Sequence, residues 1–250
     1  MGHHPTLSRL LRSLTLARPR TRPQVPAWDL SRVLQFLASR PQPVAWASHE
    51  ERQFFTCKLA FLLALATGKR RSELQALSRD PRDLRLSPHG AWLRTVAGFL
   101  PKAALPGHDP APFHIAALPP NPGSTDDRLC PVQCLSLYVR LTGGLQPGRR
   151  LFRLIRGDGA PSTDSVARWI VWAIRAAHDD PLPANAHEVR RVAASWAFQG
   201  GRHSLEDVLA AGWWASQTTF TRFYLAHLPV QPDGQFRFNP IMAGRQVPIP

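Results

Sequence analysis

Apolar residues recur at helical spacing along most of the chain beyond residue 28. The first such stretch predicts a helix that begins near Asp29 or Ser31, because apolar positions three and four apart share one helical face. Ser48 is expected to open the next helix as its N-cap. The stretch after it is apolar on nearly every side, which is typical of a helix buried in the middle of a fold. Gly68 should end it, since glycine readily adopts the left-handed conformation of a helix C-cap, and another helix is predicted over 70–77.

The period changes between residues 82 and 118. Segments 83–86, 92–96 and 113–116 alternate apolar and polar residues and are separated by turns rich in proline and glycine, which predicts antiparallel strands. The helical period then returns over 131–142, 163–178, 187–199, 204–211 and 217–226. The sequence therefore predicts a mainly α fold with a small three-stranded antiparallel sheet.

The two ends of the chain differ in character from its middle. Residues 1–27 predict a short helix and a basic strap broken by prolines, which either contacts phosphates or is a solvated terminus. Residues 228–250 are proline-rich and predict an extended tail. We expect residues 28–227 to form the catalytic domain. The basic residues of the strap are Arg18, Arg20 and Arg22.

The net charge narrows the class of partner. There are 31 lysines and arginines against 17 aspartates and glutamates, a formal charge of +14, and this excess favours a polyanion such as nucleic acid. Only Lys58, Lys69 and Lys102 are lysines, and arginine grips phosphate with a planar fork of donors. A GC-rich genome would explain the preference for arginine equally well, but not the net charge.

Other classes of protein find little support. The three cysteines show neither CxxC nor zinc spacing, so we expect no metal site and no disulfide framework. No apolar stretch reaches the roughly 20 residues of a membrane span, and the N-terminus lacks the apolar core of a signal peptide. We therefore predict no membrane partner and no cofactor.

Cleaving a phosphodiester without a metal places three demands on side chains. Charge on the non-bridging oxygens must be neutralised, the leaving alkoxide needs a proton, and the nucleophile must lose one. Arg70 follows a glycine turn at a helix start, where N–H groups and a guanidinium converge on phosphate. Glu73, one turn further along the same face, could hold that helix start or the next arginine in place. His187 and Arg190 could supply a proton acceptor and a second fork. Singly, each is more often an ordinary capping or surface residue.

The acid and the nucleophile come from other parts of the chain. Lys102, in the loop before the third predicted strand, could protonate the leaving oxygen, and it is preferred over Lys58, which we expect to be buried. Tyr224 offers a phenol, whose phosphodiester stores the energy of the cut so that rejoining can reverse it. Tyr138 is expected in the core, and Trp213 could donate its indole N–H to the phosphate.

Four further basic residues are expected to contact DNA. Each lies beside one of the candidate catalytic residues, and Lys69 is expected to point away from the face of Arg70. An exposed lysine or arginine is also compatible with a merely solvated surface. They are Lys69, Arg71, Arg191 and Arg222.

Together and in this order, these residues resemble the tyrosine recombinase (phage integrase-like) family, and most closely the recombinases of DIRS- and Ngaro-type retrotransposons. The likeness covers roughly residues 26–227. It is carried by PAWDLSRVL (26–34), ATGKRRSELQAL (66–77), GFLPK (98–102), LCPVQCL (129–135), AHEVRRVAASWA (186–197) and the block AGWWASQTTFTRFY (211–224). The combination is specific although each stretch alone is not.

The resemblance implies roles for individual residues. It places Arg70 and Arg190 on the scissile phosphate, Lys102 as acid on the 5′ oxygen, His187 as proton acceptor, Trp213 as phosphate partner in a position more often occupied by histidine, and Tyr224 as nucleophile. It also implies cofactor-free integration of a mobile element into double-stranded DNA through a 3′-phosphotyrosine intermediate. The expected assembly is a tetramer on two DNA sites, located in the nucleus if the element is eukaryotic, with 228–250 docking on a neighbouring protomer.

One departure from the family and several rival interpretations stay open. The family usually has a separate helical domain ahead of the catalytic one, and residues 1–27 hold at most its last helix, so either the chain is a fragment or its grip on DNA is reduced. A type IB topoisomerase would use the same chemistry with rotation instead of strand exchange. The sequence is also compatible with a catalytically inactive, domesticated DNA-binding module and with a plain basic helical protein.

Overall fold

The computed structural model describes most of the predicted domain. The described residues are 26–102, 112–118, 128–157, 159–199 and 204–211, together with Thr6, Arg9, Ser13, Gln217, Thr221 and Leu225. The predicted basic strap and tail lie outside them, and so does most of the helix predicted over 217–226.

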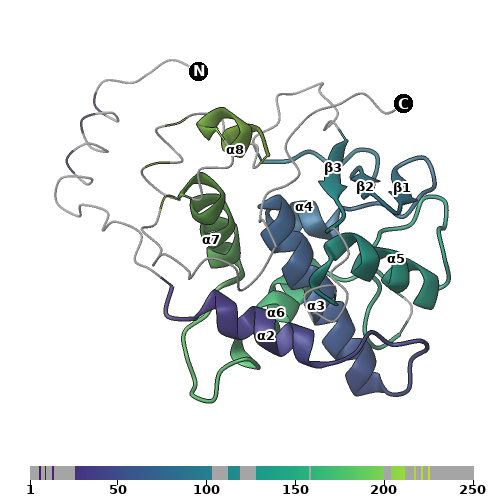
Figure 1. The fold of residues 1–250 in the computed structure, drawn as a ribbon. Coiled ribbons are helices and arrows are strands. Elements are labelled where there is room, and N and C mark those ends of the chain that lie inside the picture. Colours follow the sequence, from purple (N-terminus) through teal and green to yellow (C-terminus); the bar gives the residue numbers. More distant parts are fainter. Residues whose placement is uncertain are drawn as a thin grey trace.

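These residues form a mainly helical fold with one small sheet (Figure 1). The helices are α2 (Leu30–Ser39), α3 (His49–Thr67), α4 (Arg71–Gln75), α5 (Pro131–Leu141), α6 (Thr163–Arg175), α7 (Ala186–Gln199) and α8 (Leu205–Ala211). The strands β1 (Leu84–Ser87), β2 (Gly90–Leu93) and β3 (Phe113–Ala116) pair antiparallel in the order β1-β2-β3. The predicted fold class is confirmed. Within the described ranges, no helix combines the length and apolar character needed to span a bilayer.

Helix α3 forms the centre of the fold (Figure 1). Ser48 caps its first turn by accepting the N–H of Glu51 at 3.1 Å, as the sequence predicted. Every residue from Phe54 to Thr67 is buried, and the helix packs against α5, α6 and α7. A helix with neighbours on all sides has no solvent-facing stripe, which explains its uniformly apolar sequence. Gly68 ends it in the left-handed conformation, with φ 58°.

Helix α4 is shorter than the predicted 70–77 because the sheet captures the chain after Gln75. The backbone of Leu77 pairs with Thr95 in an isolated bridge, and the carbonyl of Ala76 accepts the N–H of Val96 at 2.8 Å. These backbone groups would otherwise continue the helix. The segment after β2 is therefore fixed directly to the end of α4.

The second strand begins two residues earlier than predicted, at Gly90, and ends at Leu93. The ring of His114, on the neighbouring strand, occupies the space beside Gly90. A Cβ at residue 90 would lie 2.1 Å from His114 Nε2 and 2.8 Å from the carbonyl oxygen of Ile115. A side chain at this position would clash with both, so the start of β2 requires glycine.

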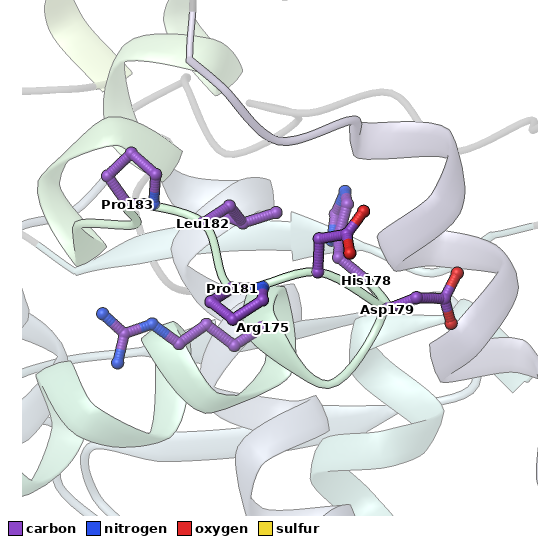
Figure 2. Close-up of a pocket in the computed structure, with 7 residues that line it drawn as sticks. Arg175, His178, Asp179, Pro181, Leu182 and Pro183 are labelled. Carbon is purple, nitrogen blue, oxygen red and sulfur yellow. The ribbon is translucent and has the colours of Figure 1, made fainter.

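The chain enters the domain against the end of α6. His178 Nε2 accepts the N–H of Asp29 at 3.1 Å, and Arg32 forms an ion pair with Asp179 at 3.0 Å. A shallow surface pocket lined by Arg175 and residues 178–183 lies here (Figure 2). These contacts fix the start of α2 to the segment that leads into α7.

Candidate active site

The turn between α3 and α4 places the first candidate residue. Thr67 Oγ1 donates to the carbonyl of Leu63 at 2.6 Å and accepts the N–H of Lys69 at 3.2 Å. Gly68 donates its N–H to Ala64 at 2.9 Å. Because every one of these groups is bonded, the backbone that leads to Arg70, the N-cap of α4, is held in one conformation.

Glu73 holds Arg70 through two hydrogen bonds. Its carboxylate accepts the backbone N–H of Arg70 at Oε2 and the Arg70 guanidinium Nη1 at Oε1, both at 2.8 Å. Glu73 is 1% exposed, and the Arg70 side chain is 20% exposed. The carboxylate therefore acts as a buried anchor, while the guanidinium it holds reaches the surface. The supporting role predicted for Glu73 fits this arrangement.

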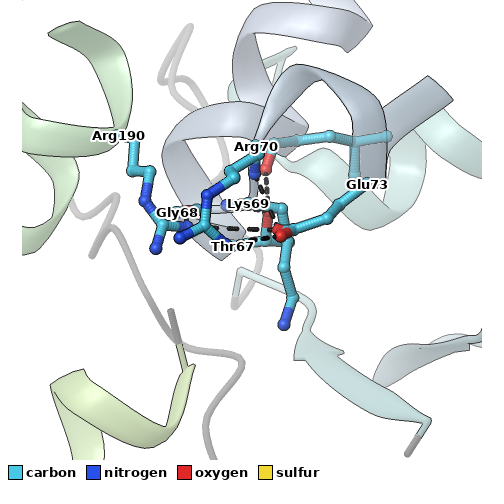
Figure 3. Close-up of polar contacts among 7 residues, drawn as sticks. Thr67, Gly68, Lys69, Arg70, Glu73 and Arg190 are labelled. Atoms are coloured by element: carbon cyan, nitrogen blue, oxygen red, sulfur yellow. Dashed lines mark hydrogen bonds and ion pairs between the residues drawn. The ribbon is translucent and has the colours of Figure 1, made fainter. Parts of the chain in front are cut away.

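The second arginine comes from α7, far along the chain. Arg190 Nη1 donates to the carbonyl oxygen of Gly68 and lies 4.0 Å from Glu73 Oε2. Figure 3 shows the guanidinium groups of Arg70 and Arg190 side by side. Arg190 is 1% exposed, so a ligand would meet Arg70 first and would reach Arg190 only if its surroundings opened.

In this cluster, three basic side chains lie around one carboxylate. Arg70, Arg190 and the buried Lys69 surround Glu73, which provides the carboxylate that interacts with all three. Buried charges are normally paired, because removing an ion from water is costly. The two guanidinium groups of Arg70 and Arg190 share the one carboxylate, which leaves a net positive charge. This is the arrangement expected of a site that binds an anion, and paired arginine forks fit a phosphate.

His187 stands at the start of α7, one turn before Arg190. Its backbone N–H donates to Asn185 Oδ1 at 2.9 Å, and the Asn185 N–H donates to Glu188 at 3.0 Å, so Asn185 and Glu188 cap the helix reciprocally. Partial desolvation lowers the pKa of His187, and the charges of Arg190, Arg70 and other nearby arginines lower it further. The imidazole is therefore neutral near pH 7 and able to accept a proton.

Glu188 and Trp28 support this helix start, and neither was predicted to take part in the site. Glu188 Oε2 accepts the indole N–H of Trp28 at 3.1 Å, and Glu188 Oε1 lies 3.9 Å from Arg191. The signal was present in part, because an asparagine followed three residues later by a glutamate is a helix N-terminus signature. The contact with Trp28 joins residues 160 apart in the chain and has no local signal.

The other predicted basic residues fall into different surroundings. Lys102 lies exposed at a turn in the loop after β2, and none of its contacts within the described residues joins it to the arginine pair. Arg71 forms an exposed ion pair with Asp164 at 2.8 Å. Arg191 lies beside Glu188. The proposed DNA contacts of Arg71 and Arg191 stay predictions.

The expectation that Lys69 contacts DNA is corrected by its burial. The residue is 3% exposed, and its Nζ lies 4.8 Å from the centroid of the Phe113 ring on β3. As predicted, its side chain points away from the guanidinium of Arg70 (Figure 3). That direction leads into the protein rather than to its surface, because β3 covers this side of the turn.

The remaining predicted residues lie outside the described part of the chain. They are Arg18, Arg20, Arg22, Trp213, Arg222 and Tyr224. Lys58 and Tyr138 are buried, as predicted, and Cys57 is buried beside Lys58 in α3. Across the residues that the structure does describe, histidine, cysteine, aspartate and glutamate form no group of three or more that could hold a metal ion.

Comparison with known proteins shows a similarity of fold but none of sequence family. No protein-family model matches the chain, and no curated protein matches it by sequence. It is similar to the XerH site-specific recombinase bound to difH substrate in a pre-cleavage complex, at 18% identity and a TM-score of 0.54, over 84% of this chain and 52% of that one. It is also similar to XerA recombinase, at 17% identity and a TM-score of 0.52, over 85% of this chain and 64% of that one.

A lambda integrase tetramer bound to a Holliday junction matches at 18% identity and a TM-score of 0.47, over 85% of this chain and 57% of that one. The chain thus spans between about half and two thirds of these structures, the covered shares being 52%, 57% and 64%. The likenesses to XerH and XerA concern the fold. The described residues have the mainly helical architecture with a small antiparallel sheet of a tyrosine recombinase catalytic domain.

Proposed function

We propose that this chain is a tyrosine recombinase that cuts and rejoins double-stranded DNA through Tyr224. The fold shared with XerH and XerA supports the family, and the residues gathered at the α3–α4 turn support the chemistry. The observation that carries the proposal is the pair of guanidinium groups, Arg70 and Arg190, held around the buried carboxylate of Glu73.

In the proposed reaction, the two guanidinium groups neutralise the non-bridging oxygens of one phosphodiester. The Tyr224 oxygen forms a bond to phosphorus and the bond to the 5′ oxygen breaks. The phenolic proton passes to neutral His187, and Lys102 gives a proton to the departing 5′ oxygen. Trp213 donates its indole N–H to the phosphate. Attack by a 5′ hydroxyl on the phosphotyrosine reverses these steps and joins a new strand.

Covalent capture of DNA tests this proposal. A pool of short duplexes of randomised sequence, each with a nick in one strand, releases a small fragment when it is cut, so that the protein–DNA adduct accumulates. We expect the wild-type protein to form an adduct that survives denaturation, and Tyr224→Phe to form none while binding the same pool. Tyr224→Phe removes only the nucleophilic oxygen.

Tyr138→Phe is the matched control, because it removes the other tyrosine hydroxyl of the chain. Tyr138 is buried in α5, where its hydroxyl accepts the backbone N–H of Arg153 at 3.0 Å, and it has no role in the proposed reaction. This variant should still form the adduct. An adduct with Tyr224→Phe, or none with the wild-type protein, would rule out Tyr224 as the nucleophile.

The proposal extends to the type of mobile element, the location of the protein and its assembly on DNA. We infer a mobile-element recombinase of the DIRS and Ngaro type, acting in the nucleus as a tetramer on two DNA sites. Exchange of strands between two labelled duplexes would support it. Relaxation of supercoiled plasmid by a monomer would instead indicate the type IB topoisomerase reaction, and salt-sensitive binding without any adduct would indicate an inactive DNA-binding module.

A further inference from the structure

Lys69 is a buried lysine inside the candidate active site, and the proposed mechanism gives it no role. It precedes Arg70 directly, and its side chain leaves the turn on the opposite side (Figure 3). Its Nζ lies 4.8 Å from the centroid of the Phe113 ring, close enough for a cation–π interaction, and Phe113 is the first residue of β3. One side chain thus connects the turn that carries the phosphate-binding arginine to the sheet.

This connection matters because β3 follows the loop that carries Lys102. The other end of that loop is also fixed to α4, where Thr95 pairs with Leu77 and the Val96 N–H donates to Ala76 at 2.8 Å. At the β3 end, Phe113 pairs with Leu93 of β2, which fixes β3 within the sheet. The contact between Lys69 and Phe113 additionally joins β3 to the start of α4.

We propose that Lys69 is a positioning residue, which holds β3 against the start of α4 and thereby helps to direct Lys102 toward a phosphate bound by Arg70 and Arg190. The proposal rests on the function inferred above for what Lys102 does. The contact between Lys69 and Phe113 does not depend on that function.

The charges around Lys69 affect whether its amine is protonated next to the Phe113 ring. Burial lowers the pKa of Lys69 well below its usual range, Arg190 and Arg70 lower it further, and Glu73 opposes them. β3 contributes the uncharged Phe113 ring. A bound phosphate adds negative charge beside the arginines and so favours the ammonium form, which is the form that a ring face attracts.

The first test measures the contact without any reaction. Lys69→Met keeps the length and apolar bulk of the side chain but removes its charge, and Phe113→Leu removes the ring from the other side. Lys58→Met is the matched control, since Lys58 is a second buried lysine, placed in α3 among Cys134 and Arg128. We expect faster amide hydrogen exchange over β3 in the first two variants and unchanged exchange there in the control.

The second test separates positioning from general damage. Cleavage of a duplex recovered from the randomised pool should slow by about tenfold to thirtyfold in Lys69→Met, the rate factor of a desolvated cation–π contact. A 5′-bridging phosphorothiolate at the scissile position yields a thiolate, which leaves without an acid. On that substrate Lys69→Met should recover the wild-type rate, as should Lys102→Ala, and the two losses should not add on the normal substrate.

The outcomes are distinct. Unchanged exchange over β3 in Lys69→Met, or equal loss of protection there in Lys58→Met, would overturn the proposed contact. A cleavage defect that persists with the thiolate leaving group would overturn the link to Lys102. Absence of any adduct from the wild-type protein would refute the proposed function, while the exchange measurement would still decide whether Lys69 holds β3.

Discussion

Replacing Glu73 by glutamine should lower the stability of the fold and weaken the contacts of residue 73 with Arg70 and Arg190. The carboxylate accepts two hydrogen bonds from Arg70 at 2.8 Å and lies 4.0 Å from Arg190 Nη1. Glu73 and Arg190 are each 1% exposed, so water offers little compensation. Glutamine keeps the volume and one acceptor oxygen, but it presents an NH₂ group to a guanidinium and removes the counter-charge.

The magnitude follows from the burial of the two pairs. Removing one partner of a buried ion pair costs about 3–5 kcal/mol, because the remaining charge stays desolvated. Arg70 is 20% exposed and can regain some hydration, which places the expected loss near the lower end, about 3 kcal/mol. For a chain of this size, that loss corresponds to a fall in Tm of roughly 6–12 °C.

Thermal unfolding followed by circular dichroism, and urea unfolding followed by tryptophan fluorescence, measure this loss. Glu50→Gln is the control, since Glu50 is exposed in the first turn of α3 and contributes only the roughly 0.3–1 kcal/mol of a charge near a helix N-terminus. If Glu73→Gln were no more destabilising than this control, Glu73 would not be the anchor of the arginine pair. The reasoning from buried charge would then be refuted.

Two further predictions concern the start of α7. As the pH falls, the single-turnover rate of adduct formation should stay constant until the pH is below about 6.5, the ordinary histidine pKa. The reason is that the pKa of His187 is lowered and only its neutral ring accepts a proton. A rate that is already halved at or above about pH 6.5 would contradict this role. Trp28→Phe should cost about 1.5–3 kcal/mol in urea unfolding, since it removes a hydrogen bond to the charged Glu188. This loss of stability should exceed that caused by Trp46→Phe, because the indole N–H of Trp46 donates to the neutral carbonyl of Leu141.

The elements of the fold were predictable because their signals are local. The start of α3 at Ser48 and its end at Gly68 follow from capping and backbone preference, and both were predicted to the residue. The predictions were wrong where a distant segment competes for the backbone. Helix α4 stops at Gln75 because Leu77 pairs with Thr95 in the segment that follows β2, and no pattern within 70–77 shows that competition.

The sequence indicated which residues belong to the candidate site, but it did not indicate their contacts and burial. The spacing of Arg70 and Glu73 predicted that Glu73 holds the helix start or the next arginine, because residues three apart on a helix are neighbours, and in the structure Glu73 contacts Arg70. The bond from Arg190 to Gly68 joins positions 122 residues apart, so it requires the whole fold. Lys69 shows the same limit: the turn set the direction of its side chain, but only the position of β3 decides that this direction is the interior.

The gathering of positive charge at the site is itself an argument about what completes it. Methionine or leucine at positions 69 and 190 would fill similar space without the cost of desolvating a charge, so stability alone does not favour these cations. A phosphodiester brings one negative charge between Arg70 and Arg190, and charge on its non-bridging oxygens grows as the tyrosine oxygen attacks. In the proposed reaction, the two guanidinium groups would therefore be offset most fully when charge on the phosphate oxygens is greatest, which is what transition-state stabilisation by Arg70 and Arg190 requires.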